Sequence, residues 1–117
     1  MFEYNATVVN VVDGDTYDLR VDLGFGVEIT KRFRLGDADT FETRKVRGAD
    51  ALEVIKGKEV KEYVTELLLN KDVVVKSERI VDKNENETDF YERYLGLVSL
   101  DGKDIGELLK ENKMVRS

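Results

Sequence analysis

Apolar and polar residues alternate in two stretches near the start of the chain, and this period of two is typical of a β-strand with one buried face. Tyr4–Val12 is rich in Val and Thr and predicts a first strand. Asp15–Leu23 predicts a second strand, in which every other position is apolar: Tyr17, Leu19, Val21 and Leu23. Asp13-Gly14 between them predicts a tight turn, because both residue types tolerate a positive φ.

A third strand follows the turn Gly24-Phe25-Gly26. It is predicted over Val27–Leu35, with Val27, Ile29 and Phe33 as its apolar set. The first three strands therefore form a meander.

A helix is predicted over Lys58–Leu69, because the apolar spacing changes to three and four residues there. The residues that form this stripe are Val60, Tyr63, Val64, Leu67 and Leu68. We expect the stripe to pack on the core. The segment before the helix, from Glu42 to about Lys56, predicts a loop.

Two more strands are expected in the second half. Asp72–Ile80 contains three consecutive valines, and Tyr91–Leu100 is again rich in apolar and aromatic residues. Val81–Thr88 between them is polar and shows no apolar pattern, which predicts a loop. Asp101-Gly102 predicts the turn that ends the fifth strand.

A short C-terminal helix begins near Asp104, because Asp104 with Glu107 three positions later approximates a capping box. Three meandering strands, a helix, two strands and a last helix are the element order of the OB-fold, a five-stranded barrel. We therefore predict a β-rich α+β protein, with one domain over residues 1–117, a helix after strand three and a short C-terminal helix. The fold alone does not define a function.

The composition limits the possible chemistry. The chain has neither cysteine nor histidine, so a general base must be a carboxylate, a lysine, a tyrosine or water. Neither a signal peptide nor a stretch of transmembrane length is apparent. We expect a cytoplasmic monomer, with a secreted mature form as the alternative.

The net charge of −6 argues against a generally basic nucleic-acid-binding surface. The charge is unevenly distributed, however. Residues 31–47 hold six basic and three acidic side chains, and a bound divalent cation would add to this local positive charge.

One part of this basic region carries a candidate site. Asp39, Thr40 and Glu42 lie within four positions, and Arg34 precedes Asp39 by five residues. Oxygen ligands suit a hard cation such as Ca²⁺, and an arginine offers a forked donor set for a phosphate. Phosphodiester hydrolysis needs such groups because charge develops on the phosphoryl oxygens. In a chain with 38% charged residues, the same cluster can also be solvated surface.

Three separated motifs resemble the staphylococcal nuclease (thermonuclease) family. They are Val12-Asp13-Gly14-Asp15-Thr16, then Arg34 with Asp39-Thr40-Phe41-Glu42-Thr43, and then Tyr91-Glu92-Arg93. The resemblance covers roughly Val8 to Val115. It implies an OB-fold barrel that uses Ca²⁺ to hydrolyse phosphodiester bonds of DNA or RNA and releases 3′-phosphate ends.

The resemblance also implies a metal site. Asp15 and Asp39 match the carboxylate ligands of the family, and the main-chain carbonyl of Thr40 matches a third ligand.

The remaining matches concern the reaction. Glu42 matches the acid that orients or deprotonates the attacking water, while Arg34 and Arg93 match the arginines that hold the phosphate. Tyr91 matches a tyrosine that hydrogen-bonds a substrate phosphate.

Three residues depart from the family pattern. Phe41 replaces a proline, Phe90 replaces a lysine that contacts phosphate, and Asp37 stands where an apolar residue is expected. If the third strand continued that far, Asp37 would share a face with Asp39 and could either support or oppose the site. The alternative function is an inactive nuclease-like module that binds nucleic acid or protein, although such modules normally lack one or more of the acidic and arginine positions.

Overall fold

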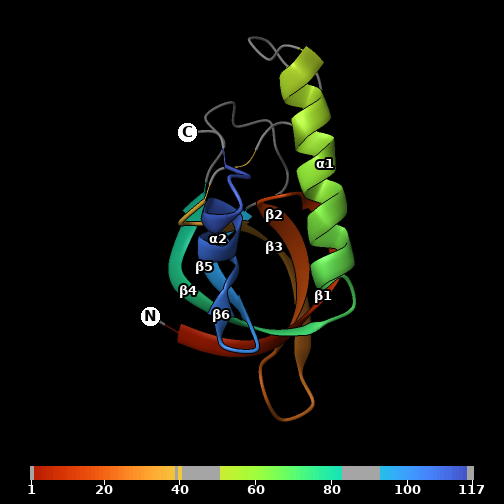
Figure 1. Ribbon diagram of the computed structural model, residues 1–117. Helices are drawn as coiled ribbons and strands as arrows, with labels where there is room; N and C mark the ends of the chain where they lie inside the picture. Colours follow the sequence, from red (N-terminus) through yellow and green to blue (C-terminus); the bar gives the residue numbers. More distant parts are fainter. Residues whose placement is uncertain (1, 39, 41–50, 83–92, 116–117) are drawn as a thin grey trace, which may run out of the picture.

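The structure is a computed structural model, which describes residues 2–38, 40, 51–82 and 93–115. Its long strands are β1 (Phe2–Asp13), β2 (Thr16–Asp22), β3 (Glu28–Leu35), β4 (Asp72–Asp82) and β5 (Arg93–Leu100). Helix α1 (Ala51–Leu68) follows β3, and a two-residue strand β6 (Lys103–Asp104) leads into helix α2 (Ile105–Glu111). Figure 1 shows α1 standing along one side of the strands and α2 on another.

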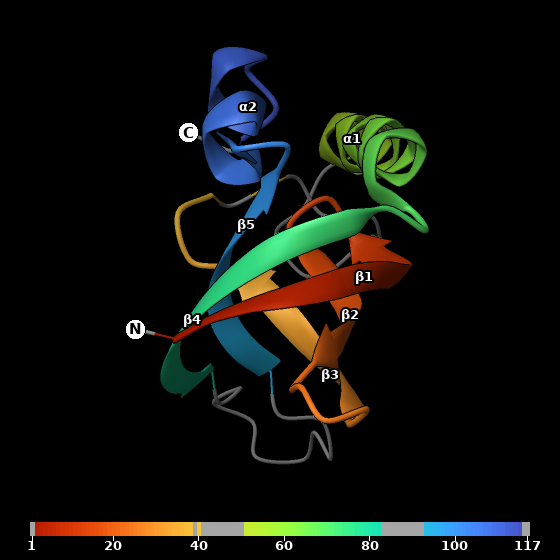
Figure 2. The ribbon, with the colours of Figure 1, turned by 90° about the horizontal axis from the view of Figure 1, so that it is seen from below.

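The five long strands close into a barrel. Their order is β3-β2-β1-β4-β5, and an additional pairing of β3 with β5 joins the two ends. This closing pair is parallel, with Phe33 opposite Tyr94, whereas the other strand pairs are antiparallel. In Figure 2, β1 and β4 lie side by side, and β2, β3 and β5 cross behind them. The predicted fold, a five-stranded mixed barrel with a helix after strand three and a short C-terminal helix, is confirmed.

The predicted alternation fills the barrel interior. Tyr17, Leu19 and Val21 of β2 are buried, together with Val8 of β1 and Val75 of β4. On α1, the predicted stripe faces this core, because Val60, Val64 and Leu68 are buried and Tyr63 and Leu67 pack against them.

Helix α1 is longer than predicted, since it begins at Ala51 rather than Lys58. The expected loop is therefore wrong over residues 51–56, while residues 42–50 lie outside the described residues. Leu52 and Ile55 are exposed, because the first turns of α1 extend beyond the barrel (Figure 1). The positions that would continue the apolar stripe into these turns hold Glu53 and Lys56, so the stripe does not predict a helix there.

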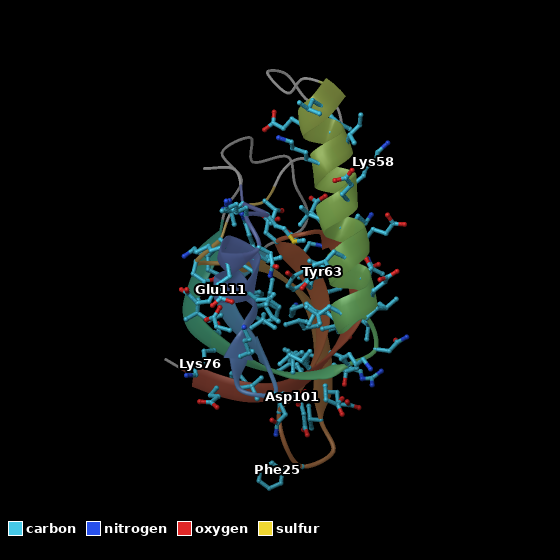
Figure 3. The ribbon with its side chains drawn as sticks, viewed as in Figure 1. Phe25, Lys58, Tyr63, Lys76, Asp101 and Glu111 are labelled. Atoms are coloured by element: carbon cyan, nitrogen blue, oxygen red, sulfur yellow. The ribbon has the colours of Figure 1, made fainter. Side chains whose placement is uncertain are left out.

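The β2–β3 hairpin also differs from the prediction. Val27 and Ile29 are exposed rather than part of an apolar face, and Leu23 is exposed as well. The reason is that the hairpin projects past the end of the barrel, so neither of its faces is covered (Figure 1). Phe25 lies fully exposed at the tip, as labelled in Figure 3, with a positive φ of 56°.

The C-terminal half follows the prediction closely. Strand β4 ends at Asp82 rather than Ile80, so Val81 belongs to the strand, and the rest of the predicted loop lies outside the described residues. The Asp104 carboxylate accepts a hydrogen bond from the Glu107 N–H, which confirms Asp104 as the N-cap of α2. Among the described residues, no helix is long and apolar enough to span a membrane.

Candidate active site

Three of the predicted site residues meet at one end of the barrel. Asp15 occupies the turn between β1 and β2, Arg34 lies at the end of β3, and Thr40 follows β3 by five residues. Thr16 pairs with Arg34 in the β2–β3 register, and the Leu35 N–H donates to the Asp15 carbonyl at 2.8 Å. The turn and the strand end are therefore held together by the backbone. The exposed hairpin tip lies at the other end of the same two strands.

The Asp15 carboxylate is the centre of these contacts. It is buried, and Oδ1 accepts a hydrogen bond from the Thr16 hydroxyl at 3.1 Å. Its Oδ2 accepts from the Thr40 backbone N–H at 3.3 Å, across 25 residues of chain. The Nε atom of Arg34 lies 3.9 Å from the same oxygen. One carboxylate thus links the first turn, the end of β3 and the segment that carries Thr40.

Burial is the largest influence on the ionisation of Asp15. It raises the pKa of Asp15 above its ordinary value, although the Thr40 and Thr16 hydrogen bonds and the Arg34 charge lower it. The negative charge of Asp13 raises it further. A buried carboxylate that the protein only partly compensates is an electrostatically favourable ligand for a divalent cation.

Thr40 contributes a second buried oxygen. Its hydroxyl Oγ1 has no hydrogen-bond partner among the described residues, and its backbone forms a bridge with Val115. Buried hydroxyls are normally hydrogen-bonded, so an unpaired one beside a buried carboxylate fits a site completed by a cation or a water. The donor set that can be described here, carboxylate and hydroxyl oxygens, suits Ca²⁺.

Close packing fixes this arrangement. A Cβ added at Gly14 would lie 2.6 Å from Cγ1 of Val60 and 2.9 Å from Oγ1 of Thr40. Only glycine fits at this point between α1 and the Thr40 segment. The buried Tyr17 hydroxyl donates to the Gly14 carbonyl, and burial raises the pKa of Tyr17 well above its ordinary range. Tyr17 therefore remains a hydrogen-bond donor and cannot act as the general base.

The other predicted site residues are described only in part. Asp39, Glu42 and Tyr91, with the departures Phe41 and Phe90, lie outside the described residues. Arg93 is the first residue of β5, and its backbone pairs with Arg32 in β3 while Leu95 pairs with Arg34. Arg93 therefore lies two residues before Leu95, the residue of β5 that pairs with Arg34. Among the described residues, no group of three acidic side chains could hold a metal ion by itself.

Asp37 does not join the Asp15 cluster. Strand β3 ends at Leu35, and the Asp37 carboxylate instead lies against the start of α2, so closely that a Cβ at Gly106 would overlap it. Burial, a hydrogen bond with the Asp104 side chain and the Asp104 charge raise the pKa of Asp37 to about 6. The nearby positive charge of Lys110 lowers it. This contact could not be predicted from the sequence, because it depends on where α2 docks.

A pocket of about 450 Å³ opens beside the site, between the end of β3 and α2. Arg34 and Lys110 contribute positive charge to it, and Asp37 contributes negative charge. Its remaining wall includes Ala38, Leu95 and Val115. Sequence reasoning missed Lys110, since the capping residues predict a helix near Asp104 but not where that helix docks. No protein-family model and no curated protein matches the chain.

Proposed function

We propose that the protein is a Ca²⁺-dependent nuclease that hydrolyses phosphodiester bonds in DNA or RNA and leaves 3′-phosphate ends. The observation that supports this most directly is the buried Asp15 carboxylate, which contacts Thr40 and lies beside Arg34 at one end of the barrel. These residues come from two of the three motifs that resemble the thermonuclease family. Long-range contact between separate motifs is expected of a shared site and not of scattered surface charge.

In this proposal, Asp15 holds the cation together with Asp39 and Thr40. The buried carboxylate supports a hard cation at this place, as does the Thr40 hydroxyl, which has no hydrogen-bond partner within the described part of the chain. When bound, Ca²⁺ supplies Lewis acidity toward a phosphoryl oxygen and neutralises part of the developing charge.

Arg34 binds the scissile phosphate. Its side chain is about one-third exposed, so it is accessible to substrate from the barrel end while Asp15 holds it near the cation ligands. A guanidinium group donates in a forked geometry that matches phosphate oxygens, and it keeps its charge at any physiological pH. Arg93 gives the second positive charge in this proposal, and Tyr91 donates a hydrogen bond to phosphate.

Glu42 orients the attacking water and accepts its proton. This role follows from the resemblance to the thermonuclease family. It is compatible with a chain that has no histidine and in which the buried donor role of Tyr17 excludes that residue as a base.

The test is cleavage of labelled single-stranded DNA in Ca²⁺ and in chelator by the wild type, Glu42→Gln and Arg34→Lys. Arg20→Lys is the matched control, because Arg20 forms an exposed ion pair with Glu28 on the projecting hairpin. We expect Ca²⁺-dependent cleavage that both site variants reduce by about 100-fold or more and that the control retains.

Nucleic-acid binding without cleavage in Ca²⁺, Mg²⁺ or Mn²⁺ would overturn the nuclease and favour the binding module instead. Equal loss of activity in Arg20→Lys would show that the effect of Arg34→Lys is not specific to the site.

A further inference from the structure

The pocket beside Arg34 combines two cations with one carboxylate, Asp37, and an apolar wall. Arg34 lines it from the end of β3, and Lys110 lines it from the last turn of α2. Its volume of about 450 Å³ lies within the range of small-molecule sites, roughly 300–1,000 Å³. An anion with a flat, partly apolar body, such as a nucleotide, matches this combination of charge and apolar surface.

The ion pair that Lys110 forms within its own helix is long and exposed. The Nζ atom of Lys110 lies 3.9 Å from Oε1 of Glu107, and both side chains are about half exposed. An exposed ion pair at this distance is weak and is easily exchanged for another anion. The ammonium shares this pocket with the Asp37 carboxylate. Lys110 can therefore either compensate the negative charge of Asp37 or bind an anion that enters the pocket.

We infer that Lys110 is a substrate-binding residue that holds a backbone phosphate adjacent to the scissile one, which Arg34 holds. This inference rests on the proposed nuclease function and adds a determinant of substrate length, because only a substrate with a second phosphate engages Lys110. A chain with a net charge of −6 repels polyanions at long range, so local cations must supply the attraction at the site. Arg34 and Lys110 supply it from two elements that border one pocket.

The test compares Lys110→Gln with Lys103→Gln. Lys103 is the matched control, because it precedes the same helix and pairs with Glu111 at 3.1 Å. With an oligonucleotide in Ca²⁺, we expect Lys110→Gln to raise KM by about tenfold, with kcat within about twofold of wild type. The salt slope of log(kcat/KM) should fall by about one, and Lys110→Arg should restore both values.

A second substrate isolates the neighbouring phosphate. It carries one cleavable phosphodiester between neutral methylphosphonates, so it offers no charged neighbouring phosphate to Lys110. On this substrate, the KM of the wild type should rise to the value that Lys110→Gln shows on the oligonucleotide. The KM of Lys110→Gln should be the same on both substrates. A purely structural role, balancing Asp37, predicts a changed melting temperature with the same KM and salt slope as wild type. That result, or an equal effect in Lys103→Gln, would overturn the inference.

Failure of the nuclease proposal is distinguishable from failure of this inference. If the wild type binds the oligonucleotide without cleaving it, fluorescence anisotropy replaces KM. A loss of about tenfold in affinity for Lys110→Gln alone would then support the role of Lys110 in a binding module. If the wild type binds no oligonucleotide, both the function and the inference fall.

Discussion

At the turn between β1 and β2, Gly14 has side chains on two sides, Val60 of α1 and Thr40 after β3. This contact sets the distance between the turn that carries Asp15 and the segment that supplies the Thr40 N–H. The resemblance to the thermonuclease family nominates Asp15 and Thr40 as candidate cation ligands. It could not show that packing against Val60 and Thr40 requires a glycine at position 14.

Gly14→Ala should therefore be destabilising, because the new methyl group meets Val60 at 2.6 Å and Thr40 at 2.9 Å. We expect a loss of about 1–3 kcal/mol in the free energy of unfolding, measured by urea denaturation. Gly36→Ala is the matched control, since a Cβ there meets nothing within 4 Å. Equal stability of the two variants would show that the turn can move away from α1 without cost.

The strands and helices could be predicted where the period of apolar residues coincides with burial in the core. Leu19 of β2 and Val64 of α1 are examples, because each is fully buried at the position that the period indicates. The predicted burial of apolar residues was wrong where a strand extends beyond the barrel, and the start of α1 was missed where the helix does so. Leu52 and Val27 are apolar but exposed, so their pattern carries no information about the core.

The contact between Asp37 and α2 could not be predicted for a different reason. It places two carboxyl groups, Asp37 and the N-cap Asp104, against each other at the start of one helix. Alternation along β3 would assign Asp37 to the candidate site. The strand ends two residues earlier, at Leu35, and helix docking then determines the surroundings of Asp37.

This contact makes stability depend on pH. The pKa of Asp37 is about 6 in the folded protein and about 3.8 in the unfolded chain, so the folded state binds more protons between these values. Stability should therefore fall as pH rises from about 4 to 6 and remain reduced above it. Asp37→Asn should flatten this part of the pH profile and stabilise the protein at pH 7 by about 1 kcal/mol, allowing for solvent screening.

The measurement is urea denaturation at intervals from pH 4 to pH 7. Glu66→Gln, at an exposed position of α1, removes the same negative charge and controls for the change in net charge. If Asp37→Asn instead lowers stability at pH 7, the ionised carboxylate is favourable against α2, and the attraction of Lys110 outweighs burial and Asp104.

Closure of the barrel brings segments that are far apart in the sequence next to one another. The parallel β3–β5 pairing joins residues about 60 positions apart, and the Gly36 N–H donates to the Gly96 carbonyl just beyond the end of β3. The order of elements could predict the barrel, and the motifs could nominate Asp15 and Arg34 as candidate site residues. The pocket with Lys110 could not be predicted, because it exists only once α2 has docked beside the end of β3.

Because the folded barrel assembles the proposed Ca²⁺ ligands, Ca²⁺ should stabilise the whole protein. At about 100 times Kd, binding to the folded state alone adds about 2.7 kcal/mol, which corresponds to a rise in Tm on the order of 10 °C. Asp15→Asn should abolish this rise. In chelator at pH 7, the same variant should melt at or above the wild-type Tm, because burial opposes the charge on Asp15 and raises its pKa.

Asp18→Asn is the control, and we expect it to lower the Tm in chelator but to keep the Ca²⁺-induced rise in Tm. Burial opposes the charge of Asp18 too, but hydrogen bonds from Arg32 and Asn10 outweigh it and lower the pKa of Asp18. Losing that carboxylate should cost about 0.5–1 kcal/mol in chelator and leave the Ca²⁺ response intact. Differential scanning calorimetry of the three proteins, with and without Ca²⁺, measures both effects. If Ca²⁺ raises the Tm of Asp15→Asn as much as that of wild type, Asp15 is not a ligand, and its burial must have another cause.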